Sequence, residues 1–257
     1  QFIAKTLPGE QSTALNFGQA FHLLMESTQA FDEGVVTTDK WKTLQGEAAK
    51  NWVADMRSAG KVGILESDLT VLRTMAAMVA RHGVVQELIA GTEKEVTFRK
   101  SFGKYTIQCR GDCWSEAKNL MVDWKTVPSI SDFKKNMVNY HYHCQASWYQ
   151  QVISLCLEYP EDKPLPRMVF VACEKEAPYE VQPFEIDGPS LDVARGEIMM
   201  ALRRMKRCFE TGNWDRPEEI ETIGLPYWYV KQAEERLLKQ KARLELEEAT
   251  KESHPCS

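Results

Sequence analysis

Apolar residues recur at helical spacing through the first third of the chain. Leucine and alanine positions in residues 12–28 follow three- and four-residue intervals, which predicts a helix whose start Ser12 or Thr13 caps. The same period predicts two further helices over residues 38–59 and 67–90. We expect the segment between the first two helices to form a long loop.

After Glu93 the helical spacing gives way to alternation of apolar and polar residues, which is typical of strands. The elements predicted beyond this point are three strands within 94–112 and 119–127, a helix over 136–158, two strands within 167–186 and a helix over 189–211. Helices followed by a strand meander and then alternating elements predict an α/β (α+β) fold, in which helices flank one central mixed β-sheet.

The last residues of the chain differ in character from the rest. Beyond residue 228, charges of both signs surround a helix-prone segment that lacks a wide apolar face. We therefore predict one domain over residues 1–228 and a charged helical tail over 229–257. A domain of that size is near the upper limit for a single α/β unit.

Composition limits the kinds of partner that the chain can have. The net charge is −5 and the pI is about 5.7, so nucleic acid would be bound only at a local site and not by a basic surface. The seven cysteines show no paired Cys-x-x-Cys spacing, which favours reduced thiols. With no secretion signal or membrane-spanning apolar run, we expect a cytoplasmic protein.

Two charged residues interrupt the otherwise apolar strand predicted over 119–127. Alternation places Asp123 and Lys125 on one face, and Asp112 ends the preceding strand. The residues between are long enough only for a turn, so a hairpin would bring Asp112 beside Asp123. Such a pair of carboxylates suits Mg²⁺ or Mn²⁺. The alternative is a structural Asp–Lys ion pair on an edge strand.

Further polar residues follow in a fixed order along the chain. His22 lies four residues after Gly18 on the first helix, and Glu95 lies on the first predicted strand. Gln145 and Tyr149 have i, i+4 spacing and hence share one helix face. Together with the acids and the lysine, this order resembles the RecB-like branch of the PD-(D/E)XK nuclease superfamily, and within it the RecE-like (exonuclease VIII) nuclease domain.

The resemblance covers about residues 12–228, including the GNW turn at 212–214 and the LPYW stretch at 225–228. One departure concerns the proline of the family's first motif, since Gly111 precedes Asp112 here. The resemblance implies the restriction-endonuclease-like core of the PD-(D/E)XK superfamily.

The resemblance also implies a metal site. Asp112, Asp123 and the backbone carbonyl of Trp124 would ligate the ions, and His22 would complete the shell. Glu95 would contact metal-bound water from outside. The alternatives are a packed or exposed histidine and an exposed strand glutamate. His82, His141 and His143 compete with His22 for its role; His141 could approach the substrate, and packing suits His143 better.

Other residues would act on the substrate. By resemblance, Lys125 would orient or help to deprotonate the attacking water, while Gln145 and Tyr149 would touch DNA phosphate or the lysine–water pair. Arg203 and Arg207 belong to a basic cluster on the last core helix, where contact with DNA or a 5′-phosphate competes with a solvated face.

The activity implied is Mg²⁺-dependent hydrolysis of DNA, with Mn²⁺ as a substitute and two ions per site. A RecE-like protein would be a processive 5′-to-3′ exonuclease that leaves 3′ single strands on linear double-stranded DNA. It would form a ring-shaped homo-oligomer, either a trimer or a tetramer. It would serve a phage or prophage recombination system in bacteria and work with a single-strand annealing protein. The alternatives are a nuclease of other polarity, an endonuclease, or a non-catalytic scaffold that binds DNA ends.

Overall fold

The computed structural model describes residues 13–103, 105–214 and 224–252. Two compact units divide the chain, Gln1–Lys206 and Arg207–Ser257. The predicted boundary after residue 228 stays a prediction.

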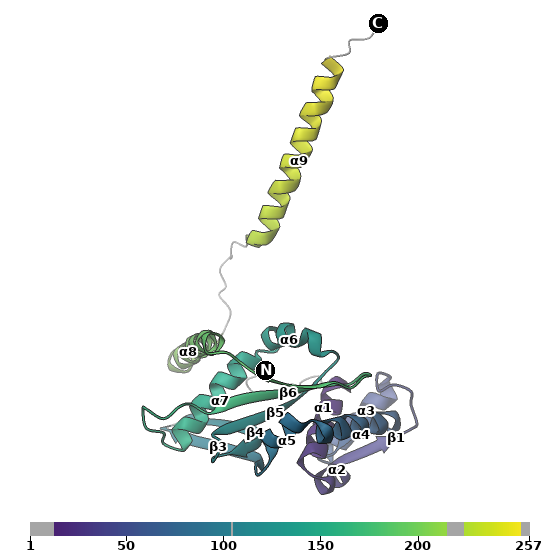
Figure 1. The fold of residues 1–257 in the computed structure, drawn as a ribbon, viewed down its shortest axis with the longest axis vertical. Helices are drawn as coiled ribbons and strands as arrows, with labels where there is room; N and C mark the ends of the chain where they lie inside the picture. The colour runs from purple at the N-terminus through teal and green to yellow at the C-terminus, as the bar shows by residue number, and fades with distance from the viewer. Residues whose placement is uncertain (1–12, 104, 215–223, 253–257) are drawn as a thin grey trace. The chain divides into compact units, whose positions relative to one another are not determined.

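A mixed five-stranded sheet is the centre of the first unit (Figure 1). Its strands, in spatial order, are β3 (Glu93–Phe102), β4 (Tyr105–Ser115), β5 (Leu120–Val127), β6 (Arg167–Glu174) and β7 (Val181–Glu185). Only the β5–β6 pair is parallel, and the other neighbours are antiparallel. The predicted fold class, a central mixed sheet flanked by helices, is confirmed.

Helices cover both faces of this sheet. On one face, α1 (Thr13–Glu26) and α4 (Glu66–Arg81) share an apolar cluster with Val122 and Trp124 of β5. On the other face, α6 (Phe133–Asn139) and α7 (Tyr142–Cys156) share a second cluster with Met121. Burial on both sides explains the almost continuous apolar run of β5, because a central strand has no solvated face.

The region before the sheet differs from the predicted helices. A small parallel sheet joins β1 (Val35–Thr38) to β2 (Val62–Leu65), and α2 (Thr28–Gly34) precedes it. The predicted loop is therefore a helix and a strand, and the predicted helix over 38–59 begins only in α3 (Glu47–Ser58). Four-residue strands are too short to show a period.

Two predicted helices are interrupted. The helix expected over 67–90 breaks at His82, whose Nδ1 accepts the backbone N–H of Val85 and so caps α5 (Gly83–Ile89). The helix expected over 136–158 is divided between α6 and α7, because His141 has a left-handed backbone with a φ of 54°. Gly83 directly follows the first break, whereas neither glycine nor proline marks the second.

The last core helix agrees with its prediction. α8 (Gly188–Thr211) carries Pro189 in its first turn, and Gly212 follows its end with a φ of 70°, a conformation that favours glycine.

In the second unit, α9 (Tyr227–Glu252) is a helix of 26 residues, and Leu237 and Leu238 are exposed on it. Within the described ranges, none of the helices combines the length and apolar character needed to cross a membrane.

Candidate active site

The strands β4 and β5 separate where their two acids meet. Their pairing runs from Ser115–Leu120 to Cys113–Val122, and the next opposed pair would be Asp112 and Asp123. Instead of continuing the ladder, Oδ2 of Asp112 accepts the backbone N–H of Trp124 over 2.7 Å. The hairpin thus brings the two acids side by side at a fork in the sheet, as its length suggested.

Close packing at the fork explains the glycine before Asp112. A Cβ atom at Gly111 would lie 1.8 Å from Sδ of Met121. Met121 is fully buried, so its side chain has no route into solvent. A side chain at this position, including the proline of the superfamily motif, would therefore require the buried methionine to shift.

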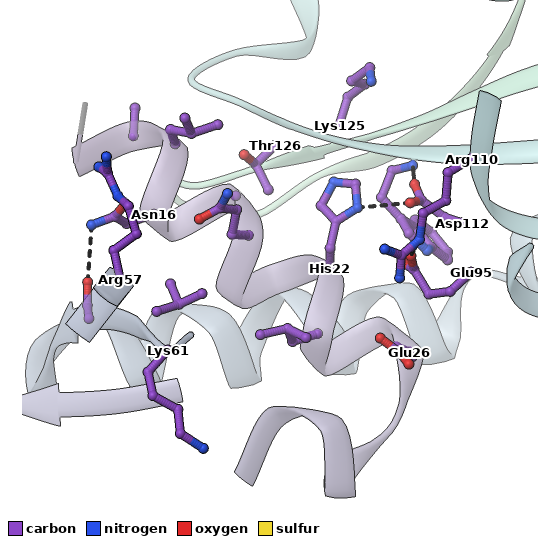
Figure 2. A pocket seen from close by; sticks show the side chains of 18 of the residues that line it. Asn16, His22, Glu26, Arg57, Lys61, Glu95, Arg110, Asp112, Lys125 and Thr126 are labelled. Atoms are coloured by element: carbon purple, nitrogen blue, oxygen red, sulfur yellow. Dashed lines mark hydrogen bonds and ion pairs between the residues drawn. The ribbon is translucent and has the colours of Figure 1, made fainter. Parts of the chain in front are cut away.

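His22 reaches the fork from α1. The neighbouring Phe21 packs edge-on against Trp124, with ring centroids 6.4 Å apart, and this contact fixes α1 on β5. Nδ1 of His22 then lies 3.0 Å from Oδ1 of Asp112 (Figure 2). The helix that carries Gly18 and His22 therefore does bring His22 to Asp112.

Glu95 completes a three-residue group with His22 and Asp112. One ligand atom from each lies within 4.8 Å of the others. On β3, Glu95 lies between Lys94 and Val96, which pair with the two neighbours of Asp112, and its φ of 54° is uncommon for a glutamate. Its carboxylate also pairs with Arg110 over 2.6 Å. Glu95 is therefore close enough to ligate the ion directly, whereas the resemblance implied only a contact with metal-bound water.

Asp123 is held by a different set of partners. Its Oδ1 accepts Nε2 of Gln145 over 2.6 Å, and its Oδ2 forms an ion pair with Lys125. Apart from this ion pair, Oδ2 accepts no hydrogen bond from the described residues, and Asp123 does not belong to the His22 group. Asp123 is also 4% exposed, so Lys125 and Gln145 compensate an acid that is almost wholly removed from water.

Aromatic rings surround the lysine. Nζ of Lys125 lies 4.8 Å from the ring centroid of Tyr142 and 5.4 Å from that of Phe170, distances at which a cation is attracted to a ring face. The lysine is therefore held by one carboxylate and two rings while its side chain still lines a cavity.

The side chain of Tyr149 lies beside Gln145 on α7 and is hydrogen-bonded to it. Burial and the charge of Asp123 raise the pKa of the Tyr149 phenol, so it remains a neutral group. The structure thus brings Gln145 and Tyr149 to the sheet face that carries Asp123, in keeping with their shared helix face.

Burial and mutual repulsion disfavour the charged forms of the acids in the site. Burial, followed by the charge of Asp112, raises the pKa of Asp123 despite Lys125. Burial and Asp112 also raise the pKa of Glu95. Burial would lower the pKa of His22, but its hydrogen bond to Asp112 and the nearby charges raise it overall. A positive ion beside the acids would favour their charged forms.

The donor atoms fit a divalent ion. Two carboxylates and one imidazole converge at one end of a cavity of about 750 Å³. Carboxylate oxygens suit Mg²⁺ and Mn²⁺, and the imidazole is tolerated best by Mn²⁺. Trp124 also lines the cavity. The residues present therefore can hold the metal that the superfamily uses.

The cavity extends along α1 beyond the acids. Arg57 of α3 and Lys61 before β2 line it on the side away from Asp112 (Figure 2). Sequence reasoning missed both residues, together with Arg110 and Tyr142. Arg110 could have been found, because it shares a strand face with Asp112 two residues on. Arg57 and Lys61 carried no signal, since only the small parallel sheet brings them there.

Neither of the two predicted DNA contacts, Arg203 and Arg207, is among the described residues that line the cavity. Arg203 is exposed on α8. Arg207 belongs to the second unit. Of the competing histidines, His82 caps a helix, whereas His141 and His143 belong to a separate cluster.

The comparisons with known proteins agree with this geometry. The family model described as "PDDEXK-like domain of unknown function (DUF3799)" matches residues 3–225. The chain belongs to this PDDEXK-like family. Its fork, with paired acids and an Asp-x-Lys strand, therefore lies in a fold of the PD-(D/E)XK nuclease superfamily, as the sequence indicated.

A solved structure also has a fold similar to that of this chain. A protein of Eubacterium rectale named "putative exonuclease" has a TM-score of 0.61 and 15% identity, with 88% of this chain and 80% of that chain covered. The structure of SSO0001 has a TM-score of 0.32 and 14% identity, with 74% and 87% covered, and carries no argument. None of the curated proteins matches this sequence.

Proposed function

We propose that this protein is a metal-dependent deoxyribonuclease of the RecE-like type, a processive 5′-to-3′ exonuclease that degrades linear double-stranded DNA and leaves 3′ single strands. The observation that carries the proposal is the fork, where Asp112, Asp123 and Lys125 converge beside an open cavity. A scaffold protein without catalysis would have no need to keep a buried acid paired with a lysine.

The metal chemistry belongs to the residues of the fork. A divalent ion held by His22, Glu95 and Asp112 would stabilise negative charge on the scissile phosphate and acidify the attacking water. We take Mg²⁺ as the physiological ion and Mn²⁺ as its substitute. Two ions per site remain part of the proposal, with Asp123 and the carbonyl of Trp124 as candidate ligands for the second.

The other side chains position the reacting groups. Lys125 is fixed by Asp123 and faces the cavity, so its ammonium can hold the water and stabilise charge on the phosphate. Gln145 keeps Asp123 in place from the α7 side, and the neutral hydroxyl of Tyr149 lies beside Gln145. Each of these groups acts through geometry that exists before substrate binds, which reduces the cost of reorganisation.

A DNA strand fits along α1. One phosphate would lie at the Asp112 group, and the adjoining backbone would run toward Arg57 and Lys61 at the other end of the cavity. These two cations supply local positive potential on a chain with a net charge of −5. Arg203 and Arg207 are candidates for contacts outside the cavity.

The remaining parts of the proposal concern assembly. A ring-shaped trimer or tetramer would enclose the duplex, so that positive potential is needed only in the central channel. A single-strand annealing protein would take the 3′ strand in a phage or prophage recombination system of the bacterial cytoplasm. Sedimentation with and without duplex DNA would test the ring.

One experiment tests the activity. Linear duplex DNA with a labelled end and a 5′-phosphate is incubated with Mg²⁺ or with EDTA, and closed circular DNA serves as the matched substrate. We expect stepwise loss of the 5′-ended strand from the linear DNA only, and only with Mg²⁺. Cleavage of the circle would indicate an endonuclease, loss from 3′ ends the opposite polarity, and tight DNA binding without cleavage the scaffold.

A further inference from the structure

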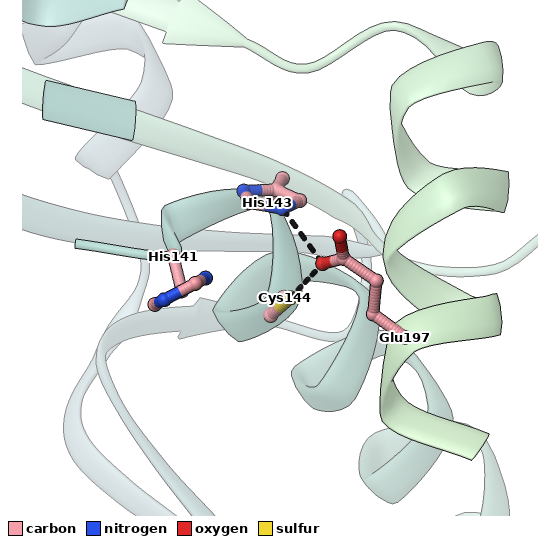
Figure 3. A group of neighbouring side chains, drawn as sticks. All are labelled: His141, His143, Cys144 and Glu197. Atoms are coloured by element: carbon pink, nitrogen blue, oxygen red, sulfur yellow. Dashed lines mark hydrogen bonds and ion pairs between the residues drawn. The ribbon is translucent and has the colours of Figure 1, made fainter. Parts of the chain in front are cut away.

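A second group of potential ligands lies outside the candidate active site. His141, His143 and Cys144 stand at the start of α7, and Glu197 faces them from α8 (Figure 3). One ligand atom of each residue lies within 4.8 Å of the other three. From this convergence we propose a zinc-binding site that joins α7 to α8.

The contacts within the cluster meet at one point. Nε2 of His143 lies 3.1 Å and Sγ of Cys144 lies 3.2 Å from the same oxygen, Oε2 of Glu197. In a tetrahedral zinc site, ligand atoms are roughly 3.2–3.8 Å apart, given zinc bonds of about 2.0–2.3 Å. The side chains therefore need only small rotations to surround an ion.

The second ring nitrogen of His143 supports this assignment. Nδ1 lies 3.3 Å from the backbone carbonyl of Met137, so it can donate its proton there. A metal-binding histidine is usually oriented by such a bond, which leaves the other nitrogen free to ligate. Nε2 then faces Glu197, on the side where the other donor atoms of the cluster lie.

The backbone also favours convergence. His141 has a left-handed conformation with a φ of 54°, which is uncommon for a residue with a side chain. This conformation turns the chain between α6 and α7 and places the ring of His141 5.9 Å from that of His143.

The donor atoms select zinc over the active-site metal. Two imidazoles, one thiolate and one carboxylate suit Zn²⁺, whereas Mg²⁺ prefers oxygen ligands and keeps much of its water. The fork offers mainly carboxylates and so has the opposite preference. The two groups would thus hold different metals in one unit.

The site would stabilise the helix that serves the fork. Gln145 directly follows Cys144, and its backbone N–H bonds to the carbonyl of His141 over 3.0 Å. An ion bound here would fix the first turn of α7 and, through it, the amide that holds Asp123. Its role is positioning and does not depend on the identity of the substrate.

Zinc content measured by mass spectrometry tests the proposal on the full-length, tag-free chain. We expect about one tightly bound Zn²⁺ per chain in the wild type, and its loss in both His141→Ala and Cys144→Ser. Cys156→Ser, at the other end of α7, and Asp112→Asn, at the fork, should both keep the ion. Co²⁺ substitution should give the sulfur-to-cobalt absorption of a thiolate site, and this band should vanish in Cys144→Ser.

Other results would overturn the site. A wild type that binds no Zn²⁺ after dialysis against a micromolar excess would overturn it, as would Cys144→Ser and His141→Ala chains that keep the ion. Loss of zinc from Asp112→Asn alone would place the ion at the fork instead. Because His141 is exposed, its alanine variant should fold, and circular dichroism checks this. None of these readouts depends on nuclease activity.

Discussion

The amide of Gln145 donates a hydrogen bond to Oδ1 of Asp123 over 2.6 Å, across 22 positions in the chain. A helix residue thus orients the buried acid of a central strand, while Lys125 binds its other oxygen. The catalytic lysine that we propose is therefore held in place through an acid that α7 controls.

Replacement of Gln145 tests this control. A hydrogen bond to a charged group contributes about 1.5–3 kcal/mol, so Gln145→Ala should reduce the cleavage rate by roughly 10- to 150-fold. DNA binding in EDTA should change little. The matched control is Gln151→Ala on the same helix. Equal rates for the two variants would remove Gln145 from the proposed machinery.

Asp123→Asn should abolish cleavage and leave the metal-free protein equally stable or more stable. Because the folded-state pKa of Asp123 is raised, its ionised form costs stability that grows as the pH rises through that pKa. Asparagine carries no charge, so the stability advantage of the variant should increase from acid to neutral pH. Thermal unfolding in EDTA measures it.

Asp132→Asn, at an exposed helix start, is the matched control for this change. Its cleavage rate and the pH dependence of its melting temperature should equal those of the wild type. Cleavage by Asp123→Asn above a few per cent of wild type would contradict the role assigned to Asp123.

His22→Ala should move the activity curve against Mn²⁺ to higher concentration, with little change in DNA binding. His22 lies in the group that we assign to the metal and does not contact the proposed strand path beyond it. Protons and the ion compete for the imidazole, so the wild-type requirement for Mn²⁺ should rise as the pH falls below the raised pKa of His22.

Without metal, His22 should affect the pH dependence of stability in the opposite sense: it stabilises the protein more at low pH. A raised folded-state pKa adds stability that is fully present below the usual value of 6.5 and is lost as the pH rises through the folded pKa. The melting temperature of the wild type in EDTA should therefore exceed that of His22→Ala most at low pH. A constant difference across pH would mean that His22 only packs.

Arg57→Ala combined with Lys61→Ala should weaken DNA binding and lower its salt dependence. Each phosphate contact removed should reduce the slope of log K against log salt by about 1. Arg73→Ala, an exposed position on α4, serves as the control and should leave the slope unchanged. Fluorescence anisotropy over a salt series measures both. An unchanged slope in the double variant would place the strand elsewhere.

Truncation near residue 230 should preserve cleavage of naked DNA. The removed segment is most of α9. Its described side chains from Lys231 to Lys241 include six charged ones, and Leu237 and Leu238 are exposed. Such a helix suits contact with a partner or another subunit, so light scattering should detect a change in assembly. A folded but inactive truncated chain would show that the helix takes part in catalysis.

Sequence pattern predicted the sheet because its strands are long enough to show a period. Alternation along β5 placed Asp123 and Lys125 on one face, and the short turn before it brought Asp112 alongside. The i, i+4 spacing likewise brought Gln145 and Tyr149 together. These relationships are local, and a regular element transmits them without knowledge of the rest of the fold.

The features that the sequence pattern did not predict depend on tertiary contacts or on the backbone conformation of a single residue. The pairing of β1 with β2 joins segments far apart in the chain, and it alone brings Lys61 to the cavity. The break at His141 needs one left-handed residue without a glycine to mark it. Sequence reasoning assigned His143 to packing because Glu197, its partner, comes from a helix more than fifty residues away.

Gly111 and Met121 are in contact but have different roles: Gly111 precedes the candidate metal ligand Asp112, and Met121 belongs to the apolar core. A proline in place of Gly111, as in the superfamily motif, would require the buried side chain of Met121 to move or to be replaced by a smaller one. Each substitution alone is harmful, since one causes a clash and the other leaves a void beneath the fork. The two sites are thus epistatic, and a lineage can exchange one motif for the other only by paired replacement or through a less stable ancestor.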